Sequence, residues 1–95
     1  MGTDINTLLQ DRKKTHGEYR DQAPIVECII ESLRSSPNWV TLPDTHRVAI
    51  YLIALKLGRV GTGNFNEPDH WADIAGYAKL VENEIVANKL IPAKQ

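Results

Sequence analysis

The stretch HRVAIYLIALKLGRV, residues 46–60, decides the fold because the helix that it predicts is apolar on almost every side. At about 100° per residue, its apolar side chains spread round the whole helix axis. The residues that interrupt them are Arg47, Tyr51, Lys56 and Arg59. Such a helix must be covered on every side. Since a chain of 95 residues has few other helices to cover it, the pattern predicts a central helix and an oligomeric assembly.

Helices on both sides of this stretch make the predicted fold all-α, a small bundle of about four helices. The N-terminal helical region is expected to be kinked, because Gly17 interrupts it. The next helix covers about residues 18–33, with a bend or restart near Ala23 because Pro24 removes a backbone donor. Cys28 lies in an apolar run of this helix, so we expect it to be buried.

The central helix and the last helix both have predictable ends. Asp44 or Thr45 can open the central helix, because either side chain caps free backbone N–H groups. Pro68 suits the first turn of the last helix, with Asn66 as its cap and an end near Asn88. No alternating strand pattern competes with these helices.

Length and composition predict one helical domain over residues 1–95, with an N-terminal arm at 1–16 and a C-terminal tail at 89–95. The formal charge of −1 argues against nucleic acid or an anionic membrane as the partner. No apolar run approaches the ~20 residues that span a bilayer, and the N-terminus lacks the pattern of a signal peptide. We therefore expect the protein to act in an intracellular, reducing compartment.

The last helix has an apolar side and a polar side. Its expected core face holds Trp71, Ile74, Ala75, Ala78, Val81 and Ile85. On the other side Asp69, Asp73 and Tyr77 follow one line, and His70 lies beside them. Two interpretations of this face stay open: a solvated surface whose acids complement the helix dipole, or a ligand site. Gly76 favours a close neighbour, since glycine costs about 1 kcal/mol relative to alanine in a helix interior.

The segment KKTHGEYR, residues 13–20, offers a second group of polar side chains. Thr15, His16 and Tyr19 supply hydrogen-bonding groups and an aromatic face beside a glycine that frees the backbone. Such a set suits a phosphorylated base. A basic helix end, placed near the negative end of the helix dipole, explains the two lysines equally well.

Several of these motifs together resemble a known group of proteins. DHWADIAGYAKLV (69–81), with KKTHGEYRDQA (13–23) upstream and ALKLGRV (54–60) between them, is similar to small phage-encoded proteins of mostly uncharacterised function. The helical layout of that group is similar to the MazG-like all-α nucleoside triphosphate pyrophosphohydrolases. The resemblance covers most of the chain and implies a phage protein in the cytoplasm of a bacterial host cell.

In the MazG-like enzymes, two pairs of acidic residues on successive helices hold Mg²⁺ against a triphosphate. Asp69 and Asp73 stand where the second pair would be, at a spacing of four residues instead of three. The first pair is missing, because residues 47–60 contain no carboxylate. Lys56 and Arg59 are suited to meet phosphate directly, or else to pair with the two aspartates.

Two functions of different classes follow from these features. The favoured one is a binder that holds a nucleotide-like phosphorylated ligand without turnover, and the phage resemblance adds the hypothesis that it sequesters a host immune signalling nucleotide. The alternatives are a MazG-like, Mg²⁺-dependent pyrophosphohydrolase and an inhibitor of a host protein. For the binder we predict no catalytic residue, metal ligand or cofactor, and the partners are the small molecule and further copies of the chain. The predicted ligand-binding residues are Thr15, His16, Tyr19, Lys56, Arg59, Asp69, His70, Asp73 and Tyr77.

Overall fold

The computed structural model describes residues 4–90 of the chain. Its α-helices are α1 (Ile5–His16), α2 (Tyr19–Arg34), α3 (Asp44–Thr62) and α4 (Pro68–Leu90), and a short 3-10 helix, η1 (Trp39–Thr41), follows α2. No strand occurs among residues 4–90. The predicted all-α fold with four helices is therefore confirmed.

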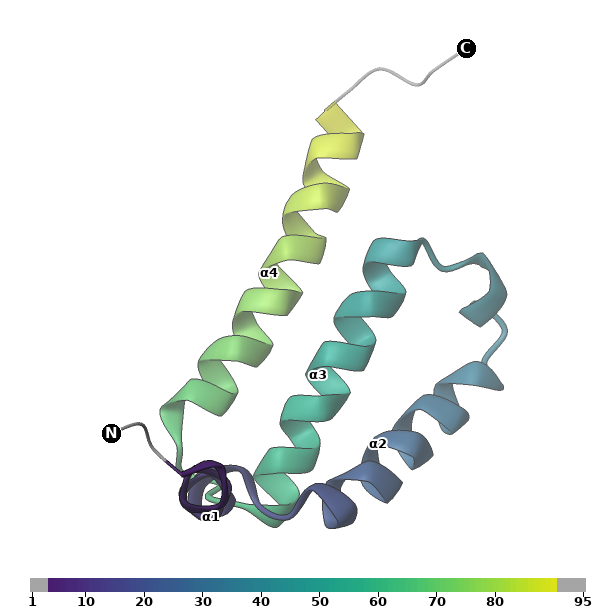
Figure 1. Ribbon diagram of the computed structural model, residues 1–95. Helices are drawn as coiled ribbons and strands as arrows, with labels where there is room; N and C mark the ends of the chain where they lie inside the picture. Colours follow the sequence, from purple (N-terminus) through teal and green to yellow (C-terminus); the bar gives the residue numbers. More distant parts are fainter. Residues whose placement is uncertain (1–3, 91–95) are drawn as a thin grey trace.

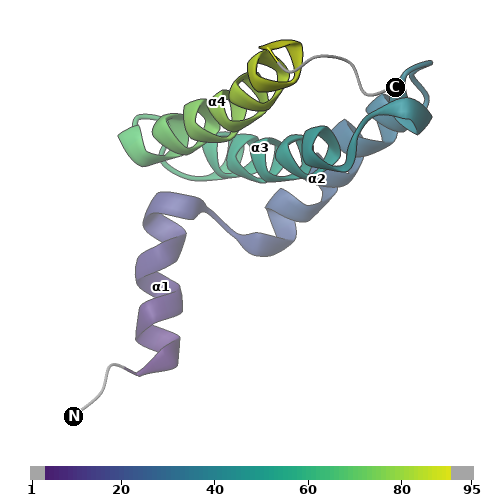
Figure 2. The same ribbon diagram turned by 90° about the horizontal axis from the view of Figure 1, so that it is seen from above.

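The helices form an open arrangement. α3 lies between α2 and α4 and packs against both of them (Figure 1). α1 is seen end-on in Figure 1 and points away from the other three helices in Figure 2. As a result the radius of gyration is 16.9 Å, compared with about 12 Å for a compact domain of this length.

α2 differs from the expected helix in two respects. It begins at Tyr19 and continues through Ala23, so the predicted restart is wrong. Pro24 lies near the helix start, where its missing N–H removes one hydrogen bond without ending the helix. Cys28 is exposed, and the expectation that it is buried is wrong. The buried side of α2 carries Ile30, and Cys28 lies about 200° round the helix from it.

The ends of the later helices are close to the predicted ones. α4 has Pro68 as its first residue, as expected. α3 begins at Asp44, but the residue at its cap position is Pro43 and no side chain caps the helix, so the prediction that Asp44 or Thr45 is the cap is wrong. Asn66 lies too far before Pro68 to be the cap of α4, so that prediction is wrong. At the other end α4 continues through Leu90, two residues into the predicted tail, and residues 91–95 lie outside the described part of the chain.

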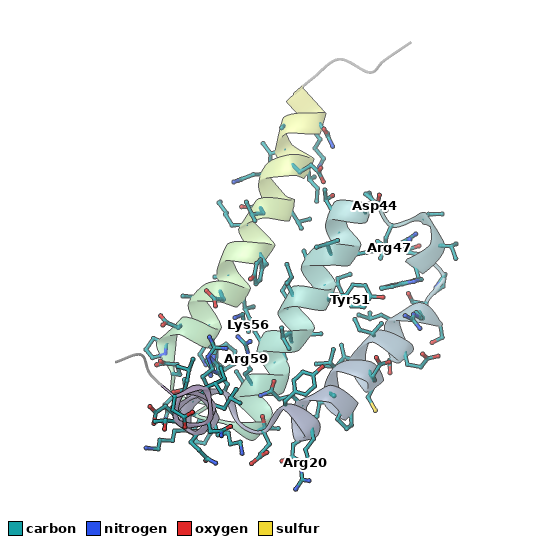
Figure 3. All side chains as sticks on the ribbon, in the orientation of Figure 1. Arg20, Asp44, Arg47, Tyr51, Lys56 and Arg59 are labelled. Carbon is teal, nitrogen blue, oxygen red and sulfur yellow. The ribbon has the colours of Figure 1, made fainter. Side chains whose placement is uncertain are left out.

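The polar residues that interrupt the apolar surface of α3 contact different neighbours. Arg47 lies over the ring of Trp39 at 5.8 Å, and Tyr51 meets the edge of the same ring at 6.2 Å. Figure 3 shows Arg47 and Tyr51 on the side of α3 toward α2 and η1, whereas Lys56 and Arg59 lie on the side toward α4. The first pair therefore holds η1 in place, and the second pair is available to a site.

A single chain does not cover α3 on every side. Ala49 and Ala54 are buried, and with Ile30 they form the buried apolar core of the described residues. Val48, however, is 55% exposed, and Leu57 is exposed as well. One copy of the chain therefore leaves part of the apolar surface of α3 uncovered.

The expected core face of α4 is correct for Ile74 and Val81 only, and its other four residues are exposed in a single chain. Trp71 is 50% exposed, and Ala75, Ala78 and Ile85 are exposed too. The less exposed residues of α4, which face α3, are His70, Asp73, Ile74, Tyr77, Val81 and Glu84. Polar side chains can face α3 because they find charged or hydrogen-bonding partners there.

Candidate functional site

The end of α1 is held against the turn between α3 and α4. The carbonyl oxygen of Thr15 accepts hydrogen bonds from the Asn64 backbone N–H at 3.0 Å and from Nε2 of His70 at 2.9 Å. The hydroxyl of Thr62 lies 3.3 Å from the carbonyl oxygen of His16 and 2.9 Å from that of Gly58, and it can donate its one hydrogen to either acceptor. His70 is only 2% exposed, so its ring is a structural part of this junction.

Two glycines allow this close approach. Gly17 has φ of +79°, and a Cβ placed on it would lie 2.2 Å from Oγ1 of Thr62. A Cβ on Gly63 would lie 2.3 Å from the carbonyl oxygen of Thr15. Since side chains have no room at either position, the direction of α1 relative to α3 and α4 is fixed by backbone contact.

An ion pair lies beside the junction. Nζ of Lys56 is 2.9 Å from Oδ2 of Asp73, and the Lys56 side chain is only 13% exposed. The hydrogen bond from Lys56 lowers the pKa of Asp73, and the positive charges of Lys56 and Arg59 lower it further. The pair joins α3 to α4 and leaves Arg59 as the neighbouring cation, as Figure 3 shows.

His16 lies between the buried histidine and the cations. Its ring centroid is 5.5 Å from that of His70. Partial burial lowers the pKa of His16 below its ordinary value of 6.5, and the nearby charge of Arg59 lowers it further. His16 is therefore neutral at neutral pH, and an anion placed next to it would favour its protonation.

A hollow of about 630 Å³ opens at the bend between α1 and α2. Its charged walls carry four cationic side chains, from Arg12, Lys13, Arg20 and Arg59, and one carboxylate, from Glu18. Glu18 is already paired with Lys13 at 3.3 Å. The hollow therefore has an excess of positive charge, although the whole chain is nearly neutral.

The structure brings some of the predicted site residues together. His16, Tyr19 and Arg59 line the hollow, and Tyr19 is 78% exposed there. Lys56 and Asp73 lie beside Arg59 at the α3–α4 contact. This grouping unites residues from three parts of the sequence.

Other predicted residues have different surroundings. Thr15 contributes its carbonyl, and His70 its buried ring, to the junction. Asp69 is exposed on the first turn of α4. Tyr77 lies farther along α4, where it lines a separate groove. The ligand-binding roles of these residues stay predictions.

The separate groove, about 350 Å³ in volume, lies between α3 and α4 on the far side of the ion pair from α1. Its apolar lining comes from Val48, Ala49, Leu52, Tyr77, Leu80 and Val81. At one end the hydroxyl of Thr45 donates a hydrogen bond to the carboxylate of Glu84. We call this feature the α3–α4 groove. No pattern in the sequence indicated it, because its walls come from two separate helices.

Arg12 is the functional candidate that sequence reasoning missed. It lines the hollow and lies one helical turn before His16, whose pKa its charge lowers. The spacing of four residues between them was a usable signal, since residues four apart share one side of a helix.

Residues 4–90 contain no group of three or more His, Cys, Asp or Glu side chains placed to hold a metal ion. Over the same part of the chain, none of the helices has both the length and the apolar character needed to cross a bilayer.

A family model described as "Domain of unknown function (DUF6378)" matches residues 3–85 of the sequence. The chain belongs to the DUF6378 family. The match includes both the hollow and the α3–α4 groove, so both features lie within the DUF6378 domain. No curated protein and no solved structure matches the chain significantly. Phage origin and similarity to MazG-like enzymes, neither of which the DUF6378 description mentions, stay predictions.

Proposed function

We propose that this protein binds a nucleotide-like phosphorylated ligand in the basic hollow at the α1–α2 bend, without turnover. The observation that carries the proposal is the concentration of four cationic side chains round a hollow of about 630 Å³ in a chain whose formal charge is −1. Positive side chains gathered in a concave site raise the local potential and attract anions.

The chemistry of the lining suits phosphate joined to a planar group. Arg12, Arg20 and Arg59 can each donate two parallel hydrogen bonds to phosphate oxygens. Tyr19 presents an exposed aromatic ring on which a base can stack. His16 can donate a hydrogen bond in either protonation state, and it gains a proton more readily once an anion is present.

The ion pair next to the hollow supports a positioning role for Asp73. Its carboxylate holds Lys56 at 2.9 Å, which keeps the Lys56 ammonium on the α4 side and leaves Arg59 free to face the hollow. In a MazG-like enzyme an acid at this place would ligate Mg²⁺. Here the carboxylate is already engaged by a cation, which favours binding over pyrophosphate hydrolysis.

The biological part of the proposal rests on the resemblance to small phage proteins. In that setting a binder without turnover acts by sequestration, and the ligand is a signalling nucleotide of the bacterial host's immune response. The proposed location is the host cytoplasm. The protein acts as a homo-oligomer, because one copy leaves α3 partly uncovered.

One experiment separates binding from turnover. The protein is incubated with a mixture of linear and cyclic nucleotides and Mg²⁺, and mass spectrometry is applied to the supernatant and to the small molecules released from the denatured protein. We expect one nucleotide to be retained unchanged. Conversion of a triphosphate to a monophosphate and pyrophosphate would replace the proposal with the enzyme.

The retained nucleotide is then titrated against variants of the hollow. Arg59→Ala and Arg20→Ala should each weaken binding by about tenfold or more, because a hydrogen bond to a charged group contributes roughly 1.5–3 kcal/mol. Lys79→Ala is the matched control, since Lys79 is an exposed cation of α4 that pairs with Glu82 outside the hollow. Equal binding by all three variants would exclude the hollow as the site.

A further inference from the structure

We infer that α1 of one copy packs into the α3–α4 groove of a second copy, so that two chains exchange their N-terminal helices. The inference rests on the self-association proposed above and does not depend on ligand binding. It specifies a surface on each side of the contact.

α1 contacts the rest of its own chain near its C-terminal end, at the junction with α3 and α4, and points away from the other helices (Figure 2). None of its residues is buried. Ile5, Leu8 and Leu9 share one side of it and are 62%, 41% and 49% exposed. A helix of 12 residues is marginal in water by itself, and it depends on packing of its apolar side. α1 therefore needs an apolar surface from another molecule.

The α3–α4 groove is an apolar surface without an occupant in its own chain. Val48 is 55% exposed and Leu80 is 67% exposed on its two walls. Gly76 lies one helical turn before Leu80, and nothing lies within 4 Å of the place where its Cβ would be. The close neighbour that Gly76 implies is absent from a single copy, and a second helix approaching this side of α4 would supply it.

A chain cannot place α1 in its own groove. The hydrogen bonds of the Thr15 carbonyl to Asn64 and His70, together with the tight contact at Gly17, fix the direction in which α1 leaves the junction. In that direction α1 points away from the other helices, as Figure 2 shows. Filling the groove from the same chain would break this junction, whereas a second copy fills it with the junction intact.

The exposed area agrees with one such contact per chain. A folded monomer of 10.7 kDa exposes about 5,500 Å² on average, whereas this chain exposes 7217 Å². The difference of about 1,700 Å² is large enough for such a contact. A standard protein interface buries about 800 Å² on each partner.

A second copy is favoured over an unrelated protein because both halves of the contact are present in every chain. Two copies related by a two-fold axis make the contact twice, which closes the assembly as a dimer. A second copy is always available as a partner. Within residues 4–90, the chain's own buried apolar core consists of Ile30, Ala49 and Ala54 alone.

The first test is the size of the full-length protein in solution, measured by light scattering at micromolar concentration. We expect a dimer or a multiple of it. Leu8→Glu and Val48→Glu should each weaken the assembly by about 100-fold or more, because each puts an unpaired carboxylate into an apolar contact. Thr7→Glu adds the same charge to the opposite side of α1 and should leave the assembly unchanged.

The second test shows whether α1 reaches the groove of the other copy. Cys28→Ser is first introduced as a background, and one preparation then carries Leu8→Cys while the other carries Val48→Cys. After the two are mixed and mildly oxidised, we expect a disulfide that joins one chain of each kind. This readout needs only folded protein, which circular dichroism checks.

Each result supports or overturns the inference. A monomer, or an assembly that survives both Leu8→Glu and Val48→Glu, would overturn it. So would an assembly in which the two cysteine variants never join to each other. Nucleotide binding by the hollow is read in a separate titration, so failure here leaves the ligand proposal standing, and failure of ligand binding leaves this one standing.

Discussion

Gly17→Ala should destabilise the protein by about 3–5 kcal/mol. Gly17 has φ of 79° and ψ of −172°, a region of backbone conformation that is open almost only to glycine, and forcing another residue into it costs roughly 1–3 kcal/mol. In addition, the new Cβ would lie 2.2 Å from the hydroxyl of Thr62 and 2.6 Å from the carbonyl carbon and oxygen of the same residue. The hydroxyl can rotate, but the backbone cannot.

Relief of that clash would require the junction to open. The hydrogen bonds from Thr62 to His16, from Asn64 to Thr15 and from His70 to Thr15 would be strained or lost, at about 1 kcal/mol each. Adding part of this cost to the backbone strain gives the total stated above.

Urea unfolding followed by circular dichroism measures the change, with protein concentration held constant because the assembly contributes to stability. Gly61→Ala is the matched control. Its Cβ would meet nothing closer than Cδ1 of Ile25 at 3.6 Å, and alanine in a helix is favoured over glycine by up to about 1 kcal/mol. If Gly17→Ala were as stable as the unchanged protein, the described contact between α1 and the α3–α4 turn would be incorrect.

Three further predictions test other parts of the molecule. Because the pKa of His16 is lowered in the folded state, its contribution to stability should be complete above pH 6.5 and should be lost as pH falls through the folded pKa. His16→Gln should therefore flatten this part of the plot of unfolding free energy against pH, and an unchanged plot would contradict the lowered pKa of His16. Trp71→Ala should cost less than about 1.5 kcal/mol, well under the roughly 3–5 kcal/mol of a buried tryptophan, since Trp71 is half exposed, and urea unfolding decides between the two values. Tyr77→Ala should weaken self-association measured by light scattering, because Tyr77 lines the α3–α4 groove and not the hollow. At a protein concentration high enough to keep the variant assembled, its nucleotide affinity should stay within about twofold of the unchanged protein, and the reverse result would return Tyr77 to the ligand site.

The sequence allowed the number of helices and the central place of α3 to be predicted. A helix that is apolar on every side has few positions open to it other than one between neighbouring helices. It did not allow the faces of α4 to be predicted. The expected core face followed from the apolar stripe through Trp71 and Ala78, on the assumption that polar residues face water. In the structure Asp73 and His70 face inward because Lys56 and the Thr15 carbonyl meet them, and these partners come from distant parts of the chain.

The candidate site was predictable only in part for the same reason. KKTHGEYR signalled a group of cations and hydrogen-bonding side chains, and His16 and Tyr19 do line the hollow. Arg59 joins them because α1 ends where α3 ends, which no local pattern reveals. The surroundings of His70 differ most from those expected: the sequence placed it on a polar, ligand-facing side of its helix, whereas in the structure it is 2% exposed and its ring meets the Thr15 carbonyl.

α1 connects the two proposals physically. The helix provides Leu9, Arg12 and Lys13 to the wall of the hollow, and it provides Ile5 and Leu8 to the proposed contact with a second copy. These roles use different parts of one short helix that has no buried residue in its own chain. A contact that orders α1 therefore also orders one wall of the hollow, and a ligand that holds that wall in place favours the ordered α1 that the contact requires. Because such coupling is reciprocal, assembly and ligand binding should strengthen each other.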